Sequence, residues 1–191
     1  YLLENGMEYK ENSTELSDAI GYAALSGDLD TLKMIYKYTD LSDSDIYTII
    51  SYGMQCSNDE YIEGIEYLVS KMSDINTYID NPNETILCLA VYNDLEKTSK
   101  MLIEHGAEVN LHIIYNAENV GNSELMKVLL NNFDIKSVSE EERQKLLYTM
   151  IESGDYEIAK YLIDKGVSIG KDSKEYLEDC PVTKMKSLLE K

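Results

Sequence analysis

One pattern recurs along the whole chain and constrains the fold more than any other feature. Its clearest copy is MLIEHGAEVN, residues 101–110, and related segments begin at Tyr1, Met34, Tyr67, Val128 and Tyr161. The position held by Gly106 in this copy returns at intervals of 33, 33, 34, 27 and 33 residues. Self-similarity at such a period is typical of repeat proteins, so the fold is predicted to be built from copies of one small unit.

A second landmark precedes five of these copies. It is a short apolar segment that in four cases ends at a glycine, namely Gly27, Gly53, Gly121 and Gly154. Glycine tolerates the positive φ that ends a helix and reverses the chain. After it a helical apolar spacing resumes, as in Leu125, Val128 and Leu129. Each repeat is therefore predicted to be a short helix, a tight turn and a longer helix, followed by a polar connection.

Residues 85–110 closely resemble the ankyrin repeat consensus. The matching residues are Thr85, Leu87, Ala90, Leu102, Gly106, Ala107, Val109 and Asn110, while Cys88 replaces the consensus histidine. Elsewhere Tyr47, Tyr115 and Tyr148 hold the histidine position. The tetratricopeptide repeat has a similar length, but its units are joined with little loop, whereas these connections are long and polar. The resemblance implies an all-α, ankyrin-like helical solenoid of about five helix-turn-helix units with partial end units.

The recurrence also predicts the organisation of the chain as a single ankyrin-like domain, residues 1–191. Segment 1–15 ends a partial first unit, and segment 171–191 is a shortened capping unit in which a second helix could begin at Pro181. Five units lie between them. Their boundaries are 16–42, 43–82, 83–110, 111–138 and 139–170. The second unit is expected to carry an insertion at residues 54–59 between its helices. Unit 111–138 is about six residues short, so it is expected to lack a full hairpin before its first helix.

Charge and cysteine usage limit the possible partners and compartment. The formal net charge is −19, which disfavours nucleic acid and anionic membranes and favours a basic protein surface. Solubility alone is an alternative explanation of this charge. Cys56, Cys88 and Cys180 are odd in number and far apart, which indicates a reducing compartment. We therefore expect a cytoplasmic protein, located in the host cytosol if it is an effector or viral protein. No apolar run approaches the roughly 20 residues of a membrane span.

No catalytic, cofactor or metal site is predicted. The two histidines, His105 and His112, lack a zinc-binding spacing, and Cys88 reads as a small buried hydrophobe. The acidic segment 40–45 lacks the glycine and glutamate of a calcium loop, so Asp43 or Ser44 is expected to cap a helix that begins near Asp45. Segments 57–60 and 139–142 read as capping boxes.

The acidic residues are concentrated in the connections between repeats. Segments 40–45, 73–84, 107–112 and 134–142 contain eleven acidic residues and Lys136 as their one base, which is about half of the excess negative charge. The general polarity of loops does not explain a single sign. We therefore interpret this acidic edge as a partner-binding surface, with Asp43, Asp80, Glu84 and Glu108 as candidate contacts.

Tyrosine is abundant, with 16 residues, and six lie in the predicted first helices, namely Tyr22, Tyr47, Tyr52, Tyr92, Tyr115 and Tyr148. The ankyrin resemblance implies that these helices line the concave side. Tyrosine offers contact area and a hydrogen-bonding tip at low entropic cost, so it is favoured at binding sites. Tyr52, Tyr92 and the adjacent Asn93 are the preferred candidates. A core role and a biased nucleotide composition remain alternative explanations for each tyrosine.

These features together predict a non-catalytic protein–protein interaction module. It would bind a basic protein surface through its hairpin tips and concave face. One alternative is an immunity or inhibitor protein that masks a basic active site, such as that of a nuclease. Another is a targeting arm of a larger enzyme or effector. A self-contained enzyme is disfavoured because no convergent reactive groups are present in the sequence.

Overall fold

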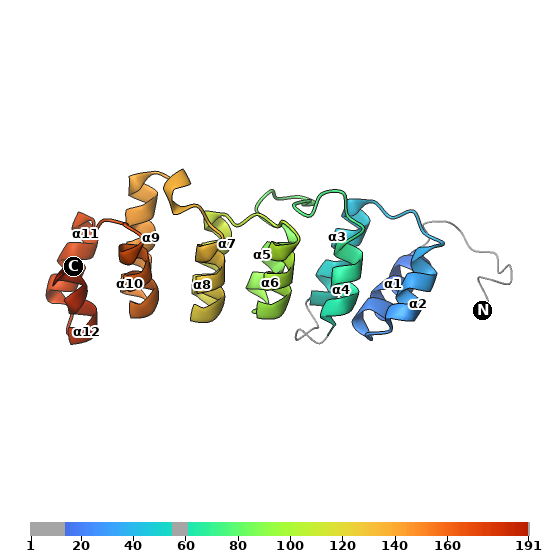
Figure 1. Cartoon of the computed structure of the whole chain (residues 1–191), viewed down its shortest axis with the longest axis horizontal. Helices are drawn as coiled ribbons and strands as arrows, with labels where there is room; N and C mark the ends of the chain where they lie inside the picture. Colours follow the sequence, from blue (N-terminus) through green and yellow to red (C-terminus); the bar gives the residue numbers. More distant parts are fainter. Residues whose placement is uncertain (1–13, 55–60, 191) are drawn as a thin grey trace. The chain divides into compact units, whose positions relative to one another are not determined.

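The computed structural model describes residues 14–54 and 61–190, and all regular structure within these ranges is helical (Figure 1). This confirms the predicted all-α fold class. The α-helices are α1 Thr14–Leu25, α2 Leu29–Tyr36, α3 Asp43–Met54, α4 Ile62–Val69, α5 Ile86–Tyr92, α6 Glu96–Glu104, α7 Leu111–Val120, α8 Ser123–Asn131, α9 Glu140–Glu152, α10 Tyr156–Asp164, α11 Lys171–Asp179 and α12 Thr183–Lys186. Two short 3-10 helices, η1 Ile135–Ser137 and η2 Ser187–Glu190, complete the set.

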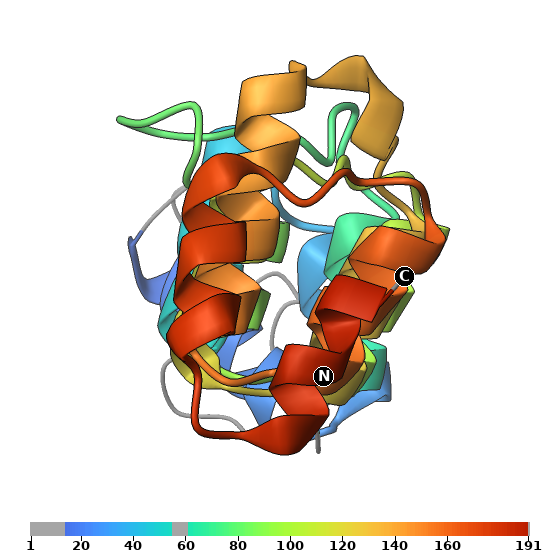
Figure 2. The same ribbon diagram turned by 90° about the vertical axis from the view of Figure 1, so that its left-hand side faces the viewer.

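The chain divides into two compact units, an N-terminal unit of residues 1–116 and a C-terminal unit of residues 117–191. Within the N-terminal unit, α3 contacts α1 and α5, while α4 contacts α2 and α6. The first helices of successive pairs thus form one layer and the second helices form another. Within the C-terminal unit, α9 contacts both α10 and α11, and Figure 2 shows α9 and α11 in one layer with α10 in the other.

The predicted order of a short first helix and a longer second helix is wrong for most pairs. Helices α1 and α3 have 12 residues each, whereas α2 and α4 have 8. Likewise α9 has 13 residues and α10 has 9, and only α5 is shorter than its partner α6. Acidic residues that were predicted to lie in connections, Asp43 and Glu140, instead begin α3 and α9. Acidic side chains in the first turn of a helix are stabilised by the helix dipole.

Three of the four glycines expected to turn the chain do so. Gly27, Gly121 and Gly154 have φ values of 72°, 77° and 82° and join the two helices of a pair. Gly53 does not, because it lies inside α3, where it is buried. In the α5–α6 pair, which lacks a glycine at this place, Asp94 adopts φ 56° instead. Aspartate tolerates this region better than most residues with a β-carbon.

Polar side chains cap the second helices directly after these turns. The carboxylate of Asp28 accepts from the amide of Thr31 at 3.0 Å, and Asn122 and Asp155 make the same bond to Leu125 and Ile158 at 3.0 and 3.1 Å. Each such cap contributes about 1 kcal/mol. The apolar residues that follow, including Leu125 and Ile158, are completely buried, so the caps fix the start of the core-facing stripe.

Of the two predicted helix caps that lie in the described residues, one is confirmed and one is wrong. The capping box predicted at 139–142 is confirmed, because Ser139 and Glu142 make both reciprocal bonds. At α3, however, Ser42 forms the cap rather than Asp43 or Ser44. Its hydroxyl and amide donate to the Asp45 carboxylate at 2.6 and 2.9 Å, and Asp45 donates its amide back at 3.2 Å. The box predicted at 57–60, like the insertion after Met54, lies outside the described residues.

The connections between helix pairs differ widely in length. Residues 70–85 separate α4 from α5, whereas residues 105–110 separate α6 from α7. The short connection precedes the short unit that the sequence places at 111–138. At the C-terminal end, α12 begins at Thr183, two residues after Pro181, and Met185 and Leu188 bury their side chains.

Candidate protein-binding surface

Three successive first helices of the N-terminal unit each expose a tyrosine. Tyr22 on α1, Tyr52 on α3 and Tyr92 on α5 are 77%, 69% and 71% exposed. Because α3 contacts both α1 and α5 in the same layer, we call their exposed side the tyrosine face. The exposure expected for Tyr52 and Tyr92 is confirmed. Tyr22 is more exposed than either, although its place in the sequence did not distinguish it from the other tyrosines.

Tyrosines at the consensus histidine position are structural to differing degrees. Tyr47 is only 7% exposed, and its hydroxyl donates to the carbonyl oxygen of Glu84 at 2.8 Å. This bond joins α3 to the residue just before the N-cap of α5. Burial, followed by the nearby negative charge of Glu84, raises the pKa of the Tyr47 phenol. Tyr115 and Tyr148 are half-buried.

Asp43 joins two connections rather than projecting freely toward solvent. Its carboxylate accepts from the amide of Ser73 at 2.9 Å, the hydroxyl of Ser73 at 2.6 Å and the amide of Asp74 at 2.8 Å. Burial by itself raises the pKa of Asp43, but these hydrogen bonds outweigh it and hold the pKa below its ordinary value of 3.8. This carboxylate of the acidic edge therefore stabilises the contact between two connections.

The other three acidic candidates are exposed. Asp80 forms no hydrogen bond or ion pair with any other described residue. The Glu84 carboxylate accepts from the amide of Asn81 at 3.1 Å, and the backbone amide of Glu108 donates to Asn76 at 2.9 Å. The Glu84 and Glu108 side chains therefore keep hydrogen-bonding capacity toward solvent. All three residues belong to connections within the N-terminal unit.

The long connection before α5 also carries an exposed apolar pair that was not predicted from the sequence as a contact. Tyr78 and Ile79 are 48% and 49% exposed and directly precede Asp80. Isolated exposed apolar residues are ordinary, but two consecutive ones beside an acidic candidate extend the available contact area. The adjacent apolar pair in a polar segment was the signal that could have revealed them.

Asn93 ends α5 and is half-buried. Its side-chain amide donates to the carbonyl of Leu89 at 2.8 Å, and its backbone amide donates to the same oxygen at 3.1 Å. Asn93 therefore caps the helix that carries Tyr92. A contact between Asn93 and a partner remains a prediction.

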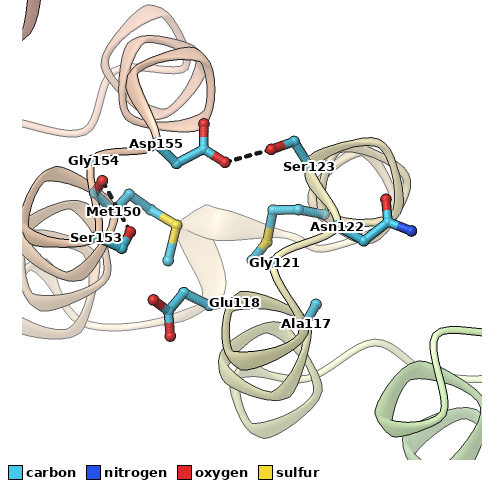
Figure 3. A pocket seen from close by; sticks show the side chains of 10 residues that line it. Ala117, Glu118, Gly121, Asn122, Ser123, Met150, Ser153, Gly154 and Asp155 are labelled. Atoms are coloured by element: carbon cyan, nitrogen blue, oxygen red, sulfur yellow. Dashed lines mark hydrogen bonds between the residues drawn. The ribbon is translucent and has the colours of Figure 1, made fainter.

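A cavity of about 400 Å³ lies within the C-terminal unit (Figure 3). Its lining includes the turn glycines Gly121 and Gly154, where an added β-carbon would meet no atom within 4 Å. Asp155 points to Ser123, which donates to it at 2.7 Å, while the Glu118 carboxylate on α7 forms no hydrogen bond with a described residue. The cavity is thus open at the turns and acidic, which suits a hydrogen-bond donor more than an anion.

Reactive groups do not converge in the described ranges. No group of three or more His, Cys, Asp or Glu side chains there could hold a metal ion. His105 contacts the carbonyl of Met101 and lies 3.7 Å from a Glu66 oxygen, and His112 is exposed. Cys88 is 3% exposed, as expected, and the amide of Asn116 donates to its sulfur. Within residues 14–54 and 61–190, no helix combines the length and apolarity needed to cross a bilayer.

Helix pairs joined by tight turns and packed pair against pair within each unit define an α-helical repeat protein. The family model of ankyrin repeats in three copies matches residues 20–113, so this part of the chain is identified as ankyrin repeats. Ankyrin repeats are generally protein–protein interaction modules, and their family is typically non-catalytic.

Two curated proteins from Latrodectus tredecimguttatus are similar to the chain. Alpha-latrocrustotoxin-Lt1a is 27% identical over 138 residues, which cover 69% of this chain and 10% of that protein. Alpha-latroinsectotoxin-Lt1a is 25% identical over 125 residues, which cover 62% of this chain and 9% of that protein. The chain therefore spans about a tenth of the length of these relatives.

Proposed function

We propose that this chain acts without catalysis, as a module that binds a basic protein through the tyrosine face. The observation that carries the proposal is the exposure of Tyr22, Tyr52 and Tyr92 on three neighbouring helices. Large aromatic side chains left in solvent on adjacent elements are available for burial by a partner. Their rings bury much area and their hydroxyls hydrogen-bond at low entropic cost.

The charge of the chain supports a basic partner. A net charge of −19 attracts cationic surfaces over long range and repels nucleic acid phosphates and anionic lipid. Asp80, Glu84 and Glu108 are exposed near the start of successive first helices, so they would steer the partner. The tyrosine face would then supply most of the binding energy. A cytoplasmic location is part of this proposal and fits the buried Cys88 thiol.

The experiment is an affinity capture from the cell of origin, followed by binding kinetics with the protein identified. The test variant replaces Tyr22, Tyr52 and Tyr92 by alanine together. We expect it to weaken binding at least about ten-fold, mainly through faster dissociation. The conservative variant with phenylalanine at the three positions should retain most of the affinity, because it keeps the ring area.

A matched control places alanine at three exposed positions of the opposite helix layer, Asp30 on α2, Glu63 on α4 and Glu104 on α6. This control should bind within about two-fold of the original protein, since it leaves the tyrosine face intact. Equal loss of affinity in the control and the tyrosine variant would show that the partner does not use this face.

A second candidate function is that of a targeting arm in a larger protein. The observation that favours it is the match to about a tenth of each of two much longer toxins. In this role the same surfaces would position an activity that lies elsewhere in the protein. Sequencing the gene upstream of the Tyr1 codon tests this candidate, and a stop codon in frame shortly before it would rule out an upstream catalytic domain.

A further inference from the structure

Two tyrosine rings in the C-terminal unit meet at a right angle. Tyr148 on α9 and Tyr176 on α11 have ring centroids 6.1 Å apart and an interplanar angle of 84°. Both rings line a groove with a volume of about 560 Å³, together with Cys180 and Pro181 after the end of α11. Tyr176 is 38% exposed. The groove is therefore an aromatic corner that is open to solvent.

The remaining lining of this groove is acidic. Asp172, Glu175 and Asp179 line it and lie three and four residues apart, on one face of α11. No lysine or arginine is among the lining residues. The nearest ion pair joins Lys171 to Glu175 at 3.7 Å between highly exposed side chains, so it neutralises the site only weakly.

The hydroxyl of Tyr148 lies in the same negative potential. It donates to a Glu152 oxygen at 3.4 Å. The negative charge of Glu152, with a further contribution from Asp172, raises the pKa of the Tyr148 phenol, because a second negative charge is disfavoured there. Negative potential beside aromatic faces is the environment that recognises organic cations.

We propose that the groove between α9 and α11 binds an arginine side chain of a basic protein partner. The planar guanidinium would stack on a tyrosine ring while its N–H groups donate to Asp172 and Asp179. Arginine fits better than lysine, because its flat ion stacks on aromatic faces and pairs with carboxylates through two parallel hydrogen bonds. This inference rests on the proposed function in one respect, that the partner is a basic protein.

A purely structural role would explain the ring contact but not the composition of the groove. Tyr148 and Tyr176 help α11 pack against α9, and one aromatic contact of this kind contributes about 1 kcal/mol. Packing alone does not require that three carboxylates and no lysine or arginine line the groove beside the rings. The two roles can be separated by measuring binding of a small probe rather than stability.

The test titrates the whole chain with N-acetyl-arginine methylamide while the tyrosine ring signals are followed by NMR. The neutral isostere N-acetyl-citrulline methylamide is the matched control probe, because it has the same shape without the charge. We expect the arginine probe to shift the signals of Tyr148 and Tyr176 and the citrulline probe to leave them unchanged. The lysine probe N-acetyl-lysine methylamide should bind about two- to five-fold more weakly.

Variants then locate the probe. Tyr176→Ala and Asp179→Asn should each weaken arginine binding about two- to five-fold, whereas Tyr176→Phe should bind like the original protein. Glu104→Gln, at an exposed carboxylate of the N-terminal unit, is the matched control for Asp179→Asn and should not change the affinity. The arginine probe should also slow alkylation of Cys180, which lines the groove, in a chain carrying Cys56→Ser.

Several results would overturn the proposal. These are unchanged Tyr148 and Tyr176 signals, equal effects of the arginine and citrulline probes, or equal binding of the arginine and lysine probes. Circular dichroism checks that each variant stays helical, and Asp179→Asn keeps the test valid if Tyr176→Ala unfolds. The probe titration needs no protein partner. If the probe does not bind, the tyrosine-face proposal is unaffected, and if the capture experiment finds no partner, the probe titration still tests the groove.

Discussion

The carboxylate of Asp43 accepts hydrogen bonds from both the amide and the hydroxyl of Ser73, 30 residues further along the chain. This separation is close to one repeat, and it recurs elsewhere. Other side chains bonded about one repeat apart within the same compact unit are Asn76 with Glu108, Ser123 with Asp155 and Tyr161 with Asn131. Polar contacts of this kind join neighbouring repeats in addition to the buried apolar residues.

Removing the Asp43 carboxylate should therefore destabilise the N-terminal unit. Asp43→Ala leaves three donors of Ser73 and Asp74 without their partner, and we expect a loss of about 1–2 kcal/mol in the free energy of unfolding. The matched control is Asp80→Ala, at an exposed aspartate with no hydrogen-bonding partner among the described residues, which should change stability by less than about 0.5 kcal/mol. Urea denaturation followed by circular dichroism measures both.

The same carboxylate should make stability depend on pH. Since the folded-state pKa of Asp43 lies below its unfolded value, the stabilisation is fully present above the unfolded pKa of about 4 and is lost as pH falls through the folded pKa. The stability difference between the original chain and Asp43→Asn should thus be constant from pH 7 to pH 5 and shrink below pH 4. A difference that persists unchanged in acid would contradict this assignment.

The glycines show how far the sequence could predict the fold. Gly27, Gly121 and Gly154 follow apolar segments, and their turns were predictable from that spacing alone. Gly53 follows the same pattern but continues α3, because it packs closely against the side chain of Leu25, which an added β-carbon would approach to 2.6 Å. Such a tertiary contact leaves no trace in local spacing. Helix lengths were misjudged for a related reason, since capping residues resemble connection residues in composition.

Two helical glycines should respond to alanine with opposite signs. At Gly64 in α4 an added β-carbon would lie 2.5 Å from the backbone oxygen of Ala24 in α1, so the two helices would have to separate. We expect Gly64→Ala to destabilise by about 1–3 kcal/mol. At Gly21 in α1 the nearest atom is 3.7 Å away, on the side chain of Ile49, so Gly21→Ala should stabilise by about 0.5–1 kcal/mol. The midpoints of urea denaturation give both values.

The candidate site was predictable only in part. The abundance of tyrosine in first helices pointed to Tyr52 and Tyr92, and both are exposed. The sequence also favoured them over Tyr47, which holds the consensus histidine position and is buried. It gave no indication that Tyr148 and Tyr176 meet, because these two residues lie 28 positions apart on different helices. The tyrosine face and the groove between α9 and α11 both depend on packing between repeats.

Removing one hydroxyl from each of two tyrosines in α3 should separate their roles. Tyr47→Phe deletes the buried bond to the Glu84 carbonyl and should cost about 1 kcal/mol of stability. Tyr52→Phe, five residues along the same helix, deletes an exposed hydroxyl and should change stability by less than about 0.5 kcal/mol. Thermal unfolding of the two variants provides the comparison. A stability loss of equal size at Tyr52 would mean that its hydroxyl serves the fold.

The exposed acidic residues of the N-terminal unit should control how fast a partner binds. Neutralising Asp80, Glu84 and Glu108 as Asn, Gln and Gln should lower the association rate about ten-fold at low salt and flatten its salt dependence, with little change in dissociation. The matched control neutralises Asp30, Glu63 and Glu104, which removes the same charge from the opposite helix layer. Because steering depends on where charge lies relative to the binding surface, this control should keep more of the original rate. Stopped-flow association at several salt concentrations distinguishes the two variants, and identical salt slopes would show that only the total charge of the chain matters.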